Sequence, residues 1–180
     1  MSTVRYLAQG DGSADGVDSV SRKLVQMLTA RGETFAAAES LTAGLLCATV
    51  ASVPGASAVL RGGVVTYATD TKALLADVPK DVLATYGPVS KLTARYMALG
   101  VANKTMADWG ISLTGVAGPT MQDGHPVGEV WCGLKPPGAS YLDGVTAVRL
   151  PVNKDGSRAE IRRQAVALAL ELLMKNLGAE

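Results

Sequence analysis

Three polar residues, Glu39, Ser40 and Thr42, interrupt the otherwise apolar stretch FAAAESLTAGLL. Residues 34–38 have the short, continuous apolar character of a strand that is covered on both faces. Residues 43–53 have the pattern of a helix that ends at the Pro-Gly pair following them. The sequence therefore predicts that Ser40 lies in a turn between a strand and a helix.

Such a turn can support the chemistry of a serine nucleophile. The free N–H groups and the positive dipole end of the following helix point into the crevice above the strand. Anions and developing oxyanions are favoured there, so the turn indicates a functional site near Ser40. A serine or threonine before a helix is also a common N-cap, and that structural role stays open for Ser40 and Thr42.

The sequence offers few bases for this serine. Its single histidine, His125, excludes a multi-histidine zinc site and would have to carry a Ser-His-Asp triad alone. We expect His125 to be exposed on its loop instead. A lysine can act as base when burial and positive neighbours lower its pKa from about 10.4 toward 7 or 8. Judged from the local sequence alone, Lys72 is a solvated helix lysine and Tyr67 a core aromatic with its hydroxyl at the surface.

Another polar turn, TGVAGPT at residues 114–120, follows a later apolar strand. Gly115 and Gly118, with Pro119 after them, can expose consecutive backbone N–H groups as an anion-binding nest. The same residues can also serve only to turn the chain.

The periodicity of the chain predicts the elements that position these turns. Residues 59–67 form a β-branched, apolar strand, and Thr69 or Asp70 can cap a short helix that carries Lys72. A long helix is predicted for residues 91–108 and a strand for residues 110–115. An amphipathic first helix runs from Asp15 to a stop at Gly32, with these apolar residues at helical spacing: Val17, Val20, Leu24, Met27 and Leu28.

The last third of the chain completes the fold. Residues 126–134 and 142–150 are predicted to form an antiparallel hairpin at the sheet edge, and Asp155 to cap the last helix. The inward stripe of that helix is Ile161, Ala165, Leu168 and Leu172. Helices alternating with apolar strands predict an α/β fold: a three-layer α/β/α sandwich with a mixed sheet, parallel in its core with an antiparallel edge hairpin.

Length and composition set the broad class. A chain of 180 residues favours one domain, which we expect at residues 15–180, after a mobile Gly-, Ser- and Asp-rich lead-in at residues 1–14. Its 17 basic and 16 acidic residues nearly cancel, which argues against nucleic acid as a partner. Neither a membrane span nor a signal peptide is apparent. Cys47 and Cys132 are isolated, so we expect buried free thiols in a cytoplasmic protein.

Six motifs in order give the chain a resemblance to a known family. They are AAAESLTAGLL, SVPGASAVLRGGVVTYATDTK, GPVS, LTGVAGP, HPVGEVW and DGSRAEIRRQAVALALELL. Together they resemble the CinA C-terminal domain family over residues 17–177. That family includes nicotinamide mononucleotide deamidase, which hydrolyses a carboxamide to a carboxylate and ammonia. The resemblance therefore implies an amidohydrolase for nicotinamide mononucleotide that needs no metal and no cofactor. We expect it to form a homo-oligomer, with a dimer as the first expectation.

The resemblance also assigns roles to residues. It implies Ser40 as the nucleophile and Tyr67 and Lys72 as the proton-handling pair. Lys72 is then the preferred base, with Tyr67 relaying the proton. The phosphate of the substrate then needs its own donors, and either Arg158 or Arg162 is a candidate beside the glycine turn. The other expected substrate-binding residues are Glu39, Thr42, Gly44, Thr114, Gly115, Ala117 and Gly118.

This chain departs from the family pattern at several positions. Leu41 replaces a cysteine, Ala43 a glycine, Thr69 an asparagine, Asp70 a glutamate and His125 a lysine. We expect the Cβ of Ala43 to narrow the turn where backbone approaches the substrate. Two other classes fit the same residues: a regulatory nucleotide-binding module without turnover, and a serine amidase for another small amide.

Overall fold

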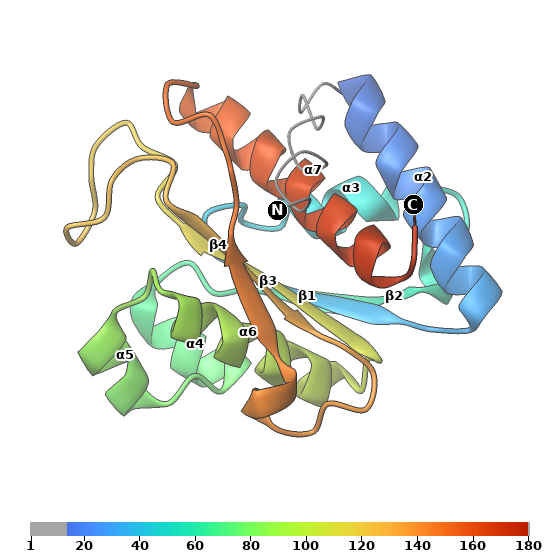
Figure 1. Cartoon of the computed structure of the whole chain (residues 1–180), viewed down its shortest axis with the longest axis horizontal. Helices are drawn as coiled ribbons and strands as arrows, with labels where there is room; N and C mark the ends of the chain where they lie inside the picture. The colour runs from blue at the N-terminus through green and yellow to red at the C-terminus, as the bar shows by residue number, and fades with distance from the viewer. Residues whose placement is uncertain (1–13, 180) are drawn as a thin grey trace.

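The computed structural model describes residues 14–179, which form five strands and six α-helices (Figure 1). The strands are β1 (Phe35–Glu39), β2 (Leu60–Val65), β3 (Trp109–Gly115), β4 (Val130–Lys135) and β5 (Thr146–Arg149). The helices are α2 (Ala14–Arg31), α3 (Leu45–Ala51), α4 (Thr69–Ala76), α5 (Lys80–Tyr86), α6 (Lys91–Thr105) and α7 (Arg158–Asn176). Two short 3₁₀ turns, η1 (Ala56–Ala58) and η2 (Leu142–Gly144), complete the fold.

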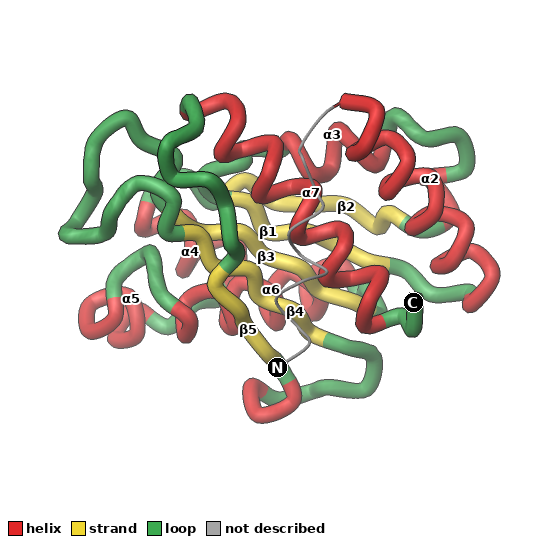
Figure 2. Tube along the Cα trace, turned by 45° about the horizontal axis from the view of Figure 1, so that its top comes forward, coloured by secondary structure: helices red, strands yellow, loops and turns green. Residues whose placement is uncertain are grey.

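The five strands form one mixed sheet in the order β2-β1-β3-β4-β5 (Figure 2). β1 lies between β2 and β3 and is parallel to both. β4 and β5 are antiparallel to their neighbours and form the edge hairpin. The predicted α/β fold with a parallel core is confirmed. Because β1, β2 and β3 run the same way, their carboxyl ends meet at one edge of the sheet, where open α/β sheets bind ligands.

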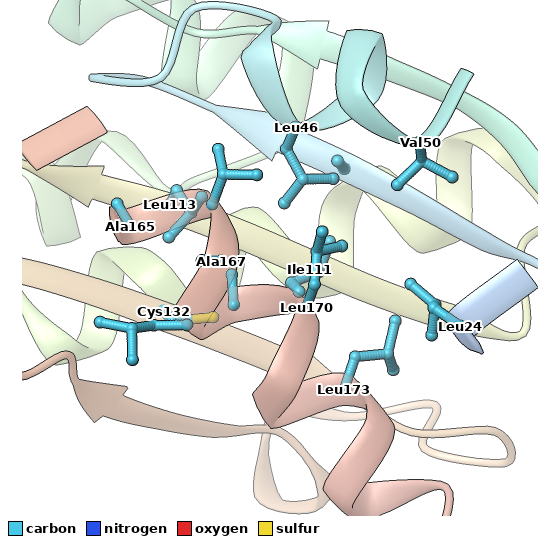
Figure 3. Close-up of a cluster of buried hydrophobic side chains, with 14 of the residues drawn as sticks. Leu24, Leu46, Val50, Ile111, Leu113, Cys132, Ala165, Ala167, Leu170 and Leu173 are labelled. Carbon is cyan, nitrogen blue, oxygen red and sulfur yellow. The ribbon is translucent and has the colours of Figure 1, made fainter. Parts of the chain in front are cut away.

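Helices cover both faces of the sheet. α2, α3 and α7 lie on one face, and α4, α5 and α6 on the other (Figure 1). The side chains of β1 alternate between the two cores: Phe35 and Ala37 pack into one, Ala36 and Ala38 into the other. Figure 3 shows the larger core, in which residues of α2, α3 and α7 meet the strands. Its labelled members include Leu24, Leu46, Ile111 and Leu170. This double coverage explains why β1 is apolar throughout.

The helix after Ser40 is shorter than predicted. Ala43 and Gly44 have φ angles of 50° and 90°, in the left-handed region, so neither can belong to an α-helix. Gly44 adopts this conformation without steric cost, which is the reason a glycine suits the position. α3 therefore begins at Leu45 rather than at residue 43. The residues between Ser40 and α3 form a separate turn.

Two predicted helix caps are wrong. Asp155 does not cap α7; Ser157 does, because its side chain and that of Glu160 form a reciprocal capping box. Neither Thr69 nor Asp70 caps α4, whose N-cap position is Ala68 and carries no side-chain bond. α7 also buries residues outside the predicted stripe, among them Leu170, whereas Leu172 of that stripe is only half-buried.

Other boundaries also differ from the sequence-based expectation. α5 was not predicted, and residues 142–144 form a 3₁₀ turn instead of the start of the last strand. α6 ends at Thr105 because Met106 takes a left-handed conformation. The predicted lead-in at residues 1–14 lies outside the described residues, apart from Ala14, which begins α2. Within residues 14–179, no helix combines the length and apolar character needed to cross a bilayer.

Candidate active site

Ser40 lies directly after β1, at the carboxyl edge of the parallel strands, as predicted. Its backbone N–H donates to the carbonyl of Leu113 at 2.8 Å, which ties the turn to β3. The residue is buried, with 8% of its surface exposed, and that remaining surface faces a cavity. The side chain is therefore held rigidly but stays accessible from the cavity.

Lys72 reaches Ser40 directly. Its Nζ lies 3.0 Å from Ser40 Oγ and donates to the carbonyl of Thr66 at 2.8 Å. The side chain comes from α4 and is 1% exposed. Burial lowers the pKa of Lys72 from its usual 10.5 to about 8. A substantial fraction of this amine is thus neutral near pH 8, as a general base requires.

Glu39 does not face the cavity but supports α3. Its two carboxylate oxygens accept from the backbone N–H groups of Leu46 at 3.0 Å and Cys47 at 2.9 Å. The expectation that the helix N–H groups are free to bind an anion is therefore wrong for these two donors. A carboxylate at the start of a helix is favourable for its dipole. Glu39 holds α3 in place behind the turn.

The turn itself retains unused donors. The carbonyl of Ser40 accepts from the N–H of Ala43 at 3.1 Å, and the carbonyl of Thr42 accepts from the N–H of Leu45 at 3.1 Å. By contrast, the N–H groups of Leu41 and Thr42 donate to no protein acceptor among residues 14–179. Leu41 lines the cavity beside Ser40. The turn, rather than α3, thus supplies candidate donors for an oxyanion.

A cavity of about 290 Å³ opens above Ser40. Its walls come from the segments that follow β1, β2 and β3 and from the start of α7. Seven of the predicted site residues line it: Ser40, Tyr67, Thr114, Gly115, Ala117, Gly118 and Arg158. Sequence reasoning had not placed these further lining residues in the site: Leu41, Thr69, Pro88, Val89, Val116, Thr120, Met121 and Gln122.

Some of the cavity-lining residues that were not predicted have a signal in the sequence, and others have none. Thr120 is the last residue of the predicted glycine turn and Met121 directly follows it, so proximity in sequence could have found both. Pro88 and Val89 carry no reactive group, and only the fold brings them to the cavity. The hydroxyl of Thr114 donates to the carbonyl of Pro88 at 2.6 Å and fixes that loop against β3.

Arg158 and Tyr67 form one wall of the cavity. Arg158 donates through Nη1 to the carbonyl of Gly118 at 2.7 Å and through Nη2 to the hydroxyl of Tyr67 at 2.6 Å. Gly118 has a φ of 82° and a Cβ there would press on Val127, so both conformation and space call for glycine. The N–H groups of Ala117 and Gly118 have no acceptor in the described part of the chain. The predicted nest and this arginine therefore adjoin one another.

Arg162 points elsewhere. Its Nε donates to the carbonyl of Leu41 at 3.0 Å and its Nη2 to the carbonyl of Thr42 at 2.8 Å. Thr42 is fully buried, and its hydroxyl oxygen has no hydrogen-bond partner among residues 14–179. Within that range the cavity lining includes none of Glu39, Thr42, Gly44 and Arg162, which surround the turn from behind.

Three expectations about individual residues are corrected. His125 is half-buried rather than exposed, and its Nδ1 lies 3.2 Å from Glu129 Oε1, away from Ser40. Ala43 is exposed and is absent from the described cavity lining, so its Cβ does not narrow the cavity. Cys47 and Cys132 are free thiols, but Cys47 is only half-buried. Burial raises the pKa of both thiols to about 12, so neither is a thiolate at neutral pH.

The fold and the site define an α/β protein with a serine–lysine pair at the carboxyl edge of its parallel strands. A model of the CinA C-terminal domain matches residues 17–177, and the chain belongs to this family. The competence-damage inducible protein of Streptococcus pneumoniae is 43% identical over 176 residues, which cover 97% of this chain. The match covers 40% of that relative, so the chain spans less than half the length of the curated relatives it matches.

Solved structures agree with the family assignment. The competence/damage inducible protein CihA from Agrobacterium tumefaciens superposes with a TM-score of 0.82 at 32% identity, over 91% of this chain and 96% of that one. A CinA superfamily protein from Klebsiella pneumoniae superposes with a TM-score of 0.82 at 28% identity, over 90% and 98% of the two chains. The family predicted from the six motifs is thus confirmed.

Proposed function

We propose that this chain hydrolyses the carboxamide of nicotinamide mononucleotide to nicotinate mononucleotide and ammonia. The observation that carries the proposal is the 3.0 Å contact between Lys72 Nζ and Ser40 Oγ at the base of a cavity. A serine becomes a nucleophile when an adjacent base can take its proton. Lys72 can do so because burial lowers its pKa to about 8.

The first half of the reaction forms an acyl-enzyme. Neutral Lys72 takes the hydroxyl proton of Ser40 while Oγ attacks the carboxamide carbon. The N–H groups of Leu41 and Thr42 donate to the oxyanion of the tetrahedral intermediate. Protonated Lys72 then gives its proton to the leaving nitrogen, and the carbon–nitrogen bond breaks to release ammonia.

The second half regenerates the serine. Neutral Lys72 takes a proton from water, whose oxygen attacks the acyl carbon, and Ser40 leaves as the hydroxyl after receiving that proton. Lys72 contacts Ser40 without an intermediary, so this step needs no relay through Tyr67. The hydroxyl of Tyr67 instead accepts from Arg158. Tyr67→Phe separates a proton role from support of Arg158, since only the former predicts a changed pH profile.

Arg158 and the glycine turn are the proposed phosphate site. Arg158 lines the cavity, and the N–H groups of Ala117 and Gly118 beside it are free of protein acceptors in the described range. Phosphate is recognised by arginine and by consecutive backbone N–H groups. Charge-assisted hydrogen bonds contribute roughly 1.5 to 3 kcal/mol each. Losing two of them predicts that nicotinamide riboside, which lacks the phosphate, is used on the order of a hundredfold or more less efficiently.

The decisive experiment measures ammonia release from nicotinamide mononucleotide by the purified chain, with a chelator present. Turnover is expected, and Ser40→Ala should reduce it by about 10³-fold or more while the protein stays folded. Parallel reactions use nicotinamide riboside, nicotinamide and glutamine. Binding without turnover would favour a regulatory module, and equal rates on all amides would favour a less selective amidase. Either result contradicts the proposed function.

A further inference from the structure

Arg162 forms a fork on the two carbonyl groups that follow the nucleophile. It extends from the second turn of α7, 120 residues away in sequence from Thr42. Its Nε binds the Leu41 carbonyl and its Nη2 the Thr42 carbonyl, at 3.0 and 2.8 Å. A planar guanidinium holds two acceptors at once in a fixed geometry, which a lysine cannot do. The side chain therefore fixes two successive peptide units of the turn.

Every carbonyl from Ser40 to Thr42 is occupied. That of Ser40 accepts from Ala43, that of Leu41 from Arg162, and that of Thr42 from both Leu45 and Arg162. The N–H groups of Leu41 and Thr42 are the unused members of the same segment within residues 14–179. In this turn the carbonyl groups of Ser40, Leu41 and Thr42 are therefore hydrogen-bonded, whereas the N–H groups of Leu41 and Thr42 are available to a ligand.

The planarity of the peptide bond connects these two facts. In a trans peptide the C=O of one residue and the N–H of the next point in opposite directions. Holding the Leu41 carbonyl against α7 therefore aims the Thr42 N–H away from α7. A cation bound to the carbonyl also polarises the peptide unit and makes its N–H a stronger donor. Oxyanion stabilisation depends on donors that are oriented before the reaction.

We infer that Arg162 is a positioning residue of the oxyanion site, acting through the Leu41–Thr42 peptide, and not a ligand for the substrate's phosphate. The inference rests on the serine chemistry of the proposed function. It does not depend on which amide is the substrate. Arg158, which precedes Arg162 by one helical turn, lines the cavity and remains the candidate for phosphate.

A fluorophosphonate probe tests the oxyanion site without nicotinamide mononucleotide. In the reaction Ser40 Oγ forms a bond to phosphorus, the phosphorus–fluorine bond breaks, fluoride leaves and Lys72 takes the serine proton. The phosphoryl oxygen occupies the place of the oxyanion during the attack. Mass spectrometry of the intact protein and of its peptides gives the rate and confirms Ser40 as the site.

The variants to compare are Arg162→Ala, Arg162→Lys and the control Arg163→Ala, which removes an exposed arginine from the same helix. We expect phosphonylation to slow about tenfold or more in Arg162→Ala and less in Arg162→Lys, and to be unchanged in Arg163→Ala. Free guanidinium at millimolar, non-denaturing concentration should partly restore the rate of Arg162→Ala. A purely structural role would not produce that rescue, and circular dichroism checks that each variant is folded.

Steady-state kinetics separate this role from phosphate binding. Arg162→Ala should lower kcat for nicotinamide mononucleotide and nicotinamide riboside alike, with KM nearly unchanged. Arg158→Ala should weaken use of the mononucleotide selectively. A mononucleotide-specific rise in KM for Arg162→Ala, or an unchanged phosphonylation rate, would overturn the inference.

Failure of the proposed function is a separate result. If the unmutated chain is inert toward nicotinamide mononucleotide but is phosphonylated at Ser40, the substrate assignment fails while the role of Arg162 is still tested by the probe. If Ser40 of the unmutated chain resists the probe at high concentration, both conclusions fall.

Discussion

Among residues 14–179 two lysines are buried, one at each end of the parallel strands. Lys72, near the carboxyl edge, is 1% exposed and contacts Ser40 Oγ and the carbonyl of Thr66. Lys135, at the opposite edge, is 7% exposed and donates to the carbonyl of Asp108 at 3.0 Å. Burial lowers the pKa of both. They differ in the groups that surround the amine.

The charge beside Lys135 accounts for the difference. The Asp108 carboxylate opposes the effect of burial on Lys135, and it also accepts from the backbone and hydroxyl of Thr34. For Lys72, desolvation is the whole cause of the lowered pKa. A lysine with a neighbouring carboxylate stays charged and ties strands together. A lysine without one, pointing at a hydroxyl beside a cavity, is suited to accept a proton.

Replacing each lysine in turn by methionine should show the largest difference between Lys72 and Lys135. Lys72→Met should reduce the hydrolysis of nicotinamide mononucleotide by about 10³-fold or more, because within residues 14–179 Lys72 is the base in contact with Ser40. Lys72→Arg should be nearly as inactive, since its guanidinium does not deprotonate. Lys135→Met is the matched control and should retain activity. The measurement is ammonia release by each folded variant. Comparable losses of activity at Lys72 and Lys135 would refute the distinction between the two lysines.

The pH dependence of the rate should follow Lys72 alone. Only the neutral amine can accept the serine proton, so kcat/KM should fall about tenfold per pH unit below an apparent pKa of about 8. Above that pH the rate should level off. Lys135→Met should show the same fall in kcat/KM at low pH. An unchanged rate between pH 6.5 and 9 would show that the base is not a lysine with a lowered pKa.

Much of the fold could be predicted from sequence because its signals are local. The apolar run of β1 and the interruption at Ser40 fix the strand-to-helix turn directly. The capping box of Ser157 and Glu160 is also a local sequence signal, and it predicts the start of α7 better than Asp155 does. α5 gave a weak signal, because a seven-residue helix depends on tertiary contacts such as those of Val82 rather than on its own propensity.

The site was less predictable because its contacts are long-range. Lys72 lies 32 residues from Ser40, and only the family resemblance paired them before the structure did. Arg158 and Arg162 are both arginines, four positions apart on one helix, so the sequence alone does not tell their roles apart. What separates them is that one reaches the carbonyl of Gly118 and the other the carbonyl of Leu41. Such a choice depends on how α7 packs, which no local pattern encodes.

Stability measurements should reveal the energetic cost of burying Lys72. The pKa of Lys72 is lower in the folded protein than in the unfolded chain, so the unfolded chain binds more protons between pH 8 and 10.5. The penalty is fully present below pH 8 and disappears as the pH rises toward 10.5. At 1.36 kcal/mol per pKa unit it amounts to roughly 3 kcal/mol. Lys72→Met removes it but loses two hydrogen bonds of about 1 kcal/mol each.

The net result for Lys72→Met should be a gain of about 1 kcal/mol in the free energy of unfolding at pH 7. This gain should fall with increasing pH and turn into a loss by pH 10, where most of the penalty on the unmutated protein has disappeared. Urea unfolding of both proteins across this range measures the difference. A difference that does not vary with pH would contradict the lowered pKa of Lys72.

The smallest effect is expected for Lys135→Met in the same measurement. Its pKa is also lowered by burial, so the sign of the pH dependence is the same: the unfolded chain binds more protons, and the variant's relative stability declines as the pH rises. The slope should be clearly shallower than for Lys72→Met, because the Asp108 carboxylate stabilises the charged amine. Lys135→Met also loses the bond to the Asp108 carbonyl, which offsets the relief of burial. Lys135→Gln, which keeps a donor without the charge, separates the hydrogen bond from the charge. If the pH dependence is as steep for Lys135→Met as for Lys72→Met, the neighbouring carboxylate does not distinguish the two lysines, and only the contact of Lys72 with Ser40 separates them.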